Sequence, residues 1–203
     1  MIATYPSQGV RGGNGKKMAV ATASISGVSL KNLKYFVGHE GGCFQGDVYI
    51  DGKKQGFWSQ DSWGGPDHFE FDATEIEKRA KEYFKKNPFV DIVELQRSGK
   101  KVEEVDFNNL PMRSELPEIE SILMDDLASL TDMFKQYKKW AKNGYTYLVK
   151  LECIHGLWPI PREDGSYKGT RTKEAAENAW KEITDKYPYA RAKMYSSVED
   201  FVL

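Results

Sequence analysis

The feature that most constrains this fold is the pair Asp51-Gly52, which lies between two short runs of strand-forming residues. Both turn residues tolerate the positive φ angles of a two-residue hairpin, so Val48–Ile50 and Phe57–Trp58 are expected to pair as antiparallel strands. Similar strand-like patterns occur at residues 19–25, 33–37 and 68–71. We therefore predict an antiparallel meander of four or five strands over residues 18–72.

A helix is expected to begin at Thr74, where Thr74 and Glu77 have the spacing of a capping box. In such a box each side chain satisfies a free backbone N–H at the start of the helix. Asn87-Pro88 should end this helix, because proline cannot continue the hydrogen-bond ladder. Its apolar residues fall on one face, which we expect to cover the meander: Ile76, Ala80, Tyr83 and Phe84.

The longest predicted helix covers residues 117–142. Pro117 is suited to its first turn, and acidic residues in its first half with lysines in its second half complement the helix dipole. Asn143-Gly144 provides a C-terminal stop. The apolar residues repeat at heptad spacing: Leu123, Leu127, Leu130, Phe134, Tyr137 and Ala141. This stripe is either an ordinary core face or the seam of a dimer.

The last third predicts a β-α-β segment, with strands at 145–153 and 190–195 around a helix capped by Thr172. A second hairpin is expected within residues 89–107. The glycine-rich residues 1–17 have no periodicity and read as a flexible N-terminal arm. The overall prediction is an α+β fold in which residues 18–203 form a single domain, with sub-lobes at 18–88 and 89–203 as an open alternative.

Composition excludes several classes of protein. The 203 residues are 40% hydrophobic, a globular value, and no apolar run approaches the length needed to span a bilayer. The N-terminus has no apolar segment of the kind found in secretory signals, which indicates a cytoplasmic protein with reduced cysteines at Cys43 and Cys153. The net charge is −1, which argues against a uniformly basic nucleic-acid binder.

Charge is nevertheless segregated along the chain. Residues 40–77 have a net charge of −7 and residues 102–134 a net charge of −8, whereas residues 78–101 have a net charge of +5. Such blocks either average out over a solvated surface or create faces of opposite potential that a partner can recognise.

The loop Ser62-Trp63-Gly64-Gly65-Pro66 is the strongest candidate for a binding site. Proline stiffens the loop, and a pre-ordered indole is what an interface hot spot needs. The alternative is that the indole folds back as a lid over the core. The candidate partner-binding residues are Trp58, Asp61, Trp63, Asp67 and Glu70.

Two alternatives remain open at this point. A single-stranded nucleic-acid or RNA-binding module would use basic residues near aromatic ones: Arg11, Lys16, Lys17, Lys31, Lys34, Lys78 and Arg79. A metal-dependent enzyme would need a cation site near His39 and His68, but the spacing of the nearby carboxylates matches no known metal-binding loop. The pair Cys153/His155 has poor geometry for proton transfer. We therefore predict no catalytic residue, no metal and no cofactor.

Several segments resemble small accessory proteins of phages, plasmids and integrative elements of bacteria. The resemblance covers roughly residues 18–75 and the last third, on the segments Leu33–Gly41, Gly46–Lys54, Asp61–Gly65 and Lys193–Phe201. That family has no established activity, so the resemblance implies no functional residue. It implies a context in which counter-defence proteins, including anti-CRISPR proteins, act by stoichiometric binding. The sequence thus predicts a non-enzymatic inhibitor of a host effector such as a nuclease.

Overall fold

A computed structural model describes residues 20–39, 41–85, 112–152, 167–186 and 191–203. The predictions for the arm at 1–17, the second hairpin at 89–107 and the pair Cys153/His155 lie outside these residues. Within them, the protein is an α+β fold with two antiparallel sheets.

The N-terminal sheet is the predicted meander. Five strands follow one another in the order β1-β2-β3-β4-β5, and all neighbours are antiparallel. The strands are β1 (Ser24–Ile25), β2 (Val28–Val37), β3 (Gly42–Ile50), β4 (Lys53–Ser59) and β5 (His68–Phe69). Asp51 and Gly52 join β3 to β4 with φ angles of 48° and 79°. This left-handed pair matches the right-handed twist of the strands, so the hairpin is confirmed.

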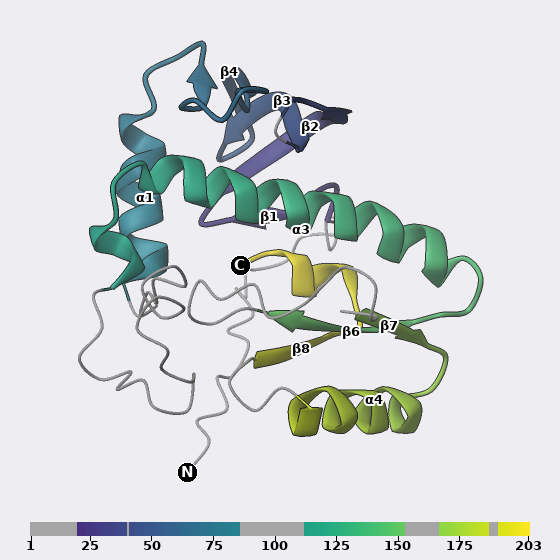
Figure 1. The fold of residues 1–203 in the computed structure, drawn as a ribbon. Coiled ribbons are helices and arrows are strands. Elements are labelled where there is room, and N and C mark those ends of the chain that lie inside the picture. The colour runs from purple at the N-terminus through teal and green to yellow at the C-terminus, as the bar shows by residue number, and fades with distance from the viewer. Residues whose placement is uncertain (1–19, 40, 86–111, 153–166, 187–190) are drawn as a thin grey trace, which may run out of the picture.

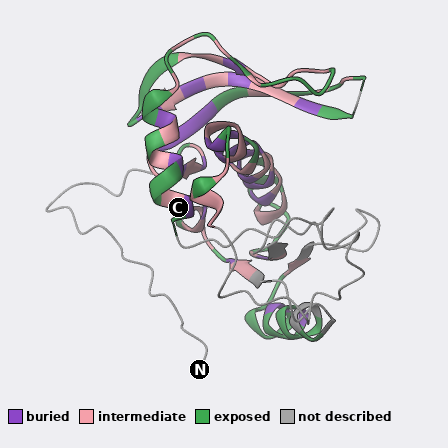
Figure 2. Cartoon of the chain, turned by 60° about the vertical axis from the view of Figure 1, so that its left-hand side comes forward, coloured by how far each residue is buried: buried purple, intermediate pink, exposed green. Residues whose placement is uncertain are grey.

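The long helix α3 (Ile119–Ala141) lies between the N-terminal sheet and the C-terminal sheet (Figure 1). It confirms the helix predicted at 117–142 within a few residues. Its heptad stripe is buried: Leu123, Leu127, Leu130, Phe134 and Tyr137 all belong to the protein's own core. Figure 2 shows buried positions on both the N-terminal sheet and α3. The proposed dimer seam on this stripe is therefore wrong, because the same side chains already pack inside the chain.

Helix α1 (Thr74–Phe84) buries Ile76, Ala80 and Phe84, but it packs mainly against α3 and the short turn η3 (Arg113–Glu115). The helix that lies across β1 and β2 is α3. The predicted capping box is not formed. The carboxylate of Asp72 accepts the backbone N–H of Thr74 at 3.0 Å and also its hydroxyl, since Asp72 precedes the helix and reaches its first turn.

The C-terminal sheet has the order β7-β6-β8, formed by β6 (Tyr147–Glu152), β7 (Tyr167–Thr170) and β8 (Arg191–Tyr195). The two predicted strands and the helix α4 (Lys173–Lys186) are present, and β7 is an additional strand. The Thr172 hydroxyl accepts the N–H of Ala175 at 3.2 Å, as expected for a cap. Both β7 and β8 pair antiparallel to β6.

The C-terminal residues return to the N-terminal sheet. After the turn η4 (Val198–Phe201), Leu203 exchanges two backbone hydrogen bonds with the β1 region, at 2.7 Å to Ser26 and 2.9 Å to Ser24. Phe201 stacks on Tyr195 and contacts Phe134, so one hydrophobic cluster joins the two sheets through α3. In the part of the chain that the structure describes, no helix is long and apolar enough to cross a membrane.

Candidate binding surface

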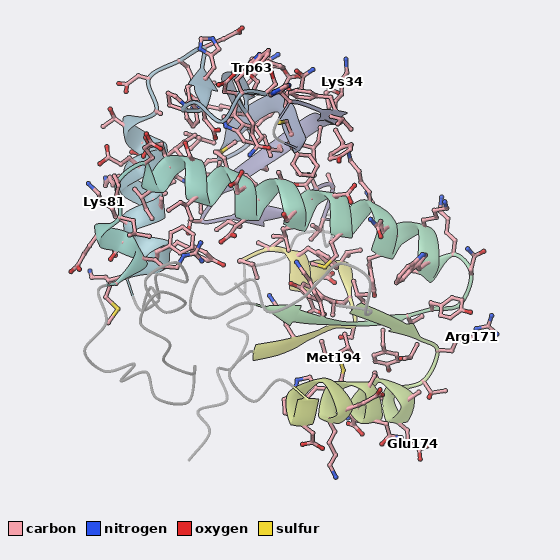
Figure 3. All side chains as sticks on the ribbon, in the orientation of Figure 1. Lys34, Trp63, Lys81, Arg171, Glu174 and Met194 are labelled. Atoms are coloured by element: carbon pink, nitrogen blue, oxygen red, sulfur yellow. The ribbon has the colours of Figure 1, made fainter. Side chains whose placement is uncertain are left out.

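Trp63 lies in the loop between β4 and β5 at the end of the N-terminal sheet (Figure 3). Its side chain is 68% exposed, so the indole is presented to solvent and is not a lid over the core. The indole stacks on the imidazole of His39, with ring centroids 4.4 Å apart and an interplanar angle of 25°. His39 comes from the turn after β2, so two segments distant in sequence hold the indole.

Backbone and side-chain hydrogen bonds fix this loop. The Asp61 carboxylate accepts the N–H of Gly65 at 2.7 Å, which closes the loop around Trp63. The N–H of His39 donates to the carbonyl of Ser62 at 2.8 Å. Gly38 lies so close to Ser62 that a Cβ there would be 2.8 Å from the Ser62 Cβ. The aromatic pair is therefore pre-ordered, which lowers the entropic cost of using it in an interface.

Trp58 does not belong to this surface. Its side chain is fully buried, and its indole N–H donates to the Asp67 carboxylate at 2.7 Å. The prediction that Trp58 is an exposed contact residue is wrong. On β4 it faces the side of the sheet that α3 covers, together with Val48 and Leu30 of the core.

Asp67 is a structural carboxylate at the boundary between the loop and α3. It accepts hydrogen bonds from Trp58 and from the hydroxyl of Ser121. Partial burial raises its pKa above the ordinary value, and the nearby charges of Glu118 and Glu120 act in the same direction. The two hydrogen bonds oppose this rise because they favour the ionised form.

Asp125 on α3 completes an acidic zone beside the loop. The side-chain amide of Gln60 donates to Asp125 at 2.6 Å, which ties the start of the loop to the helix. Desolvation, Asp67 and Asp126 together raise the pKa of Asp125 to about 7. Asp125 is nevertheless an exposed residue, so solvent screens its charge and reduces this effect. Acids from the two negative blocks of the sequence, Asp67 and Asp125, thus interact where the β4–β5 loop meets α3.

The five predicted partner-binding residues therefore do not share one exposed surface. Trp63 and Asp61 share one loop, and Asp67 joins that loop to α3. Glu70 is exposed but acts electrostatically on Lys54 of β4. The sequence analysis considered His39 only for a cation site and did not recognise it as the stacking partner of Trp63. The glycines flanking His39 were the available signal, because they allow the turn to approach the loop.

The residues of the nucleic-acid alternative do not form one surface in the described part of the chain. Arg11, Lys16 and Lys17 lie outside the described residues. Lys31 lies over the ring of Tyr49 at 4.1 Å, and Lys34 is exposed on β2. Lys78 is exposed on α1, whereas the side chain of Arg79 is bound to other parts of the protein.

The guanidinium of Arg79 donates to the Asp51 carboxylate at 2.7 Å and 3.0 Å and to the carbonyl of Ser26 at 2.7 Å. It also donates to Glu75 at 2.9 Å. Its donors are thus used to hold the β3–β4 turn against α1 and are not available to a nucleic-acid backbone.

The described residues contain no cluster of three or more His, Cys, Asp and Glu side chains that could hold a metal ion. His39 is stacked on Trp63, and His68 is exposed on β5. Cys43 is buried and free, which agrees with a reduced thiol at this position. Its thiol lies 3.8 Å from the Asp61 carbonyl, so it packs beneath the Trp63 loop.

No family model, curated protein or solved structure matches this chain.

Proposed function

We propose that this protein is a non-enzymatic binding protein that docks on a macromolecular partner through Trp63 and His39. The observation that supports this function is the exposed indole, held by a ring stack and by a loop closed through the Asp61 carboxylate. Tryptophan is among the side chains most enriched in interface hot spots, where it contributes a large rigid contact area.

The charge beside the indole favours a basic partner. Glu118, Glu120 and Asp125 each interact electrostatically with Asp67, and the pKa values of Asp67 and Asp125 are both raised. A cationic partner surface would relieve this repulsion and accelerate encounter. Such a surface competes with nucleic acid for a basic groove. The resemblance to mobile-element proteins supports, as the partner, a host nuclease effector such as a CRISPR nuclease.

The first test is an affinity pull-down of the tagged protein from a lysate of its bacterial host, with and without nuclease treatment. We expect a defined protein partner that persists after nuclease digestion. Recovery of nucleic acid, with proteins lost on digestion, would instead support the nucleic-acid alternative and contradict the proposal.

The decisive measurement uses the recovered partner and a matched pair of tryptophan variants. Trp63→Ala should weaken binding by about 2 kcal/mol or more, whereas Trp180→Ala, which removes an exposed indole on α4, should leave the affinity unchanged. Equal effects of the two substitutions would contradict a specific role for Trp63. Glu118→Lys reverses an exposed charge and should slow association most strongly at low salt.

Asp61 and Asp67 are poor positions for charge reversal. Asp61 closes the loop through Gly65, and Asp67 accepts the indole N–H of Trp58. Substitutions there would change the stability of the fold together with the surface, so loss of binding would not identify a contact.

A further inference from the structure

Among the residues that the structure describes, the outer edge of β2 has no strand paired with its second half. β2 extends from Val28 to Val37, but β1 pairs only with Val28 and Ser29. The hydroxyl of Thr22 donates to the carbonyl of Leu30 at 3.1 Å, which covers the edge at that position. From Leu33 onward, no strand among the described residues pairs with this side of β2. The other side is paired with β3 as far as Val37.

Three independent contacts determine which backbone groups point outward from this edge. The N–H of Gly38 donates to the carbonyl of Gly41 at 2.6 Å, across the turn that joins β2 to β3. Backbone groups alternate in direction along an antiparallel strand, so those of Phe36 and Lys34 also point toward β3.

The second contact is on β3. Phe44 lies opposite Tyr35, but its N–H donates to the Gln60 side chain at 2.7 Å and its carbonyl accepts the N–H of Gln60 at 3.0 Å. Both backbone groups of Phe44 are therefore used on the β4 side. Tyr35 and Phe44 form a pair without mutual hydrogen bonds, and the N–H and C=O of Tyr35 point away from β3.

The third contact is on the edge itself. The ammonium group of Lys135, from α3, donates to the carbonyl of Leu33 at 3.1 Å. This carbonyl therefore points outward, in phase with Tyr35 and Val37. Together these contacts show that backbone groups of Leu33, Tyr35 and Val37 point outward. An additional strand bonds to every second residue of an edge, which is the spacing of these three residues.

The side chains at the edge suit strand addition. Tyr35 is 55% exposed and Val37 is 77% exposed, and both are residue types that form favourable cross-strand pairs. The ring of Tyr35 packs edge-on against Phe44, with centroids 5.4 Å apart, so it is fixed in place. Natural proteins shield open edges of this kind unless they are used in pairing.

The charge along the edge is positive. Lys34 and Lys31 are exposed on β2, and Lys135 reaches the carbonyl of Leu33. The nearest carboxylate of the sheet, Asp47, is already bound by Lys54 at 2.8 Å and by Asn32 at 2.7 Å. A second copy of this edge would bring like charges together, which is unfavourable, whereas an acidic strand would be attracted.

We propose that the edge of β2 from Leu33 to Val37 binds an extended acidic segment of a partner protein as an additional strand. This edge ends two residues before His39, so it adjoins the Trp63 surface, but the proposal rests on different contacts and does not depend on docking through Trp63. The added strand bonds to the outward groups of Tyr35 and Val37, and its carboxylates pair with Lys34 and Lys135.

Amide hydrogen exchange on the full chain tests this proposal, with a synthetic peptide of about ten alternating valine and glutamate residues as the probe. In the free protein the amides of Lys34 and Phe36 should exchange slowly and those of Tyr35 and Val37 rapidly. The peptide should slow exchange at Tyr35 and Val37 by about tenfold or more. A peptide with lysine in place of glutamate should have no effect.

A matched pair of variants separates edge pairing from general attraction between charges. Val37→Pro removes an outward N–H that is not bonded to β3, so it should abolish the protection of the Tyr35 amide by the peptide without unfolding the sheet. Val37→Thr keeps this donor and should retain protection. Equal behaviour of the two variants would overturn the proposal, because it would place the peptide away from the edge.

Three further results would also overturn it. Slow exchange of Tyr35 and Val37 in the dilute free protein would mean that the chain covers its own edge. Protection that rises with protein concentration, together with a dimeric mass, would identify a second copy as the occupant. An absence of protection at millimolar acidic peptide would show that the edge does not accept such a strand.

Discussion

Replacement of Trp58 by phenylalanine should destabilise the protein strongly, although phenylalanine is also a large aromatic residue. Trp58 is fully buried, and its indole N–H donates to the Asp67 carboxylate at 2.7 Å. Phenylalanine removes that donor from a partly buried carboxylate, which costs about 1–3 kcal/mol. The smaller ring also leaves unfilled volume in the core, which adds about 1 kcal/mol. The expected loss in the free energy of unfolding is about 2–4 kcal/mol.

Urea denaturation of the wild type and Trp58→Phe, monitored by circular dichroism, measures this loss directly. Trp63→Ala is the matched control. Its side chain is 68% exposed, so the free energy of unfolding should change by less than about 0.5 kcal/mol. The prediction is that Trp58→Phe lowers the free energy of unfolding far more than Trp63→Ala does.

A double-mutant cycle isolates the hydrogen bond from the lost volume. Asp67→Ala removes the acceptor and Trp58→Phe removes the donor of this one contact, so their effects on the free energy of unfolding should be non-additive by about 1 kcal/mol. Strict additivity, or a cost of Trp58→Phe below about 1 kcal/mol, would refute the reasoning that this bond anchors the loop to the core.

Three further substitutions test other contacts. The pKa of Asp125 is raised to about 7, so the stability linked to its protonation is present near pH 4 and lost as the pH rises through 7. Asp125→Asn should therefore stabilise the fold at pH 8 but not at pH 4. The gain should be less than about 1 kcal/mol, because Asp125 is exposed and solvent screens its charge. Thermal unfolding at both pH values measures the difference. Arg79→Met should lower the urea midpoint, since it removes the donors to Asp51 and to the carbonyl of Ser26. An unchanged midpoint would contradict a structural role for Arg79. Gly38→Ala should displace the loop at Ser62 and weaken partner binding without contacting the partner, which calorimetric titration with the recovered partner would reveal.

Local signals in the sequence were sufficient to predict most elements of the fold. Asp51-Gly52 requires a tight hairpin because few other residue pairs accept two positive φ angles. The helix at 119–141 follows from its apolar period and its charge gradient. These features depend on backbone conformations and on neighbours three or four residues apart, so they can be read without the tertiary structure.

Local signals were not sufficient where two residues competed for one role. Thr74 has the spacing of a capping residue, but the N-cap is Ala73, and Asp72 before it accepts the N–H and hydroxyl of Thr74. The heptad stripe of α3 can face a second copy or the chain's own sheets, and only the packing of both sheets on this helix excludes the dimer seam. The spacing of an apolar stripe indicates that it is buried, but it does not indicate whether the chain itself or a second copy covers it.

The candidate site shows the same division. The sequence by itself determined that an indole stands in a stiff glycine–proline loop within an acidic segment. Only the tertiary structure decided that Trp58 is core, because this depends on which face of β4 is covered by α3, more than 60 positions away in sequence. It also decided that the loop after β4 holds Trp63 at the surface. It also brought His39 onto Trp63, and Asp125 beside Asp67. Contacts between distant segments arise from packing of whole elements, and no pattern of near neighbours records them.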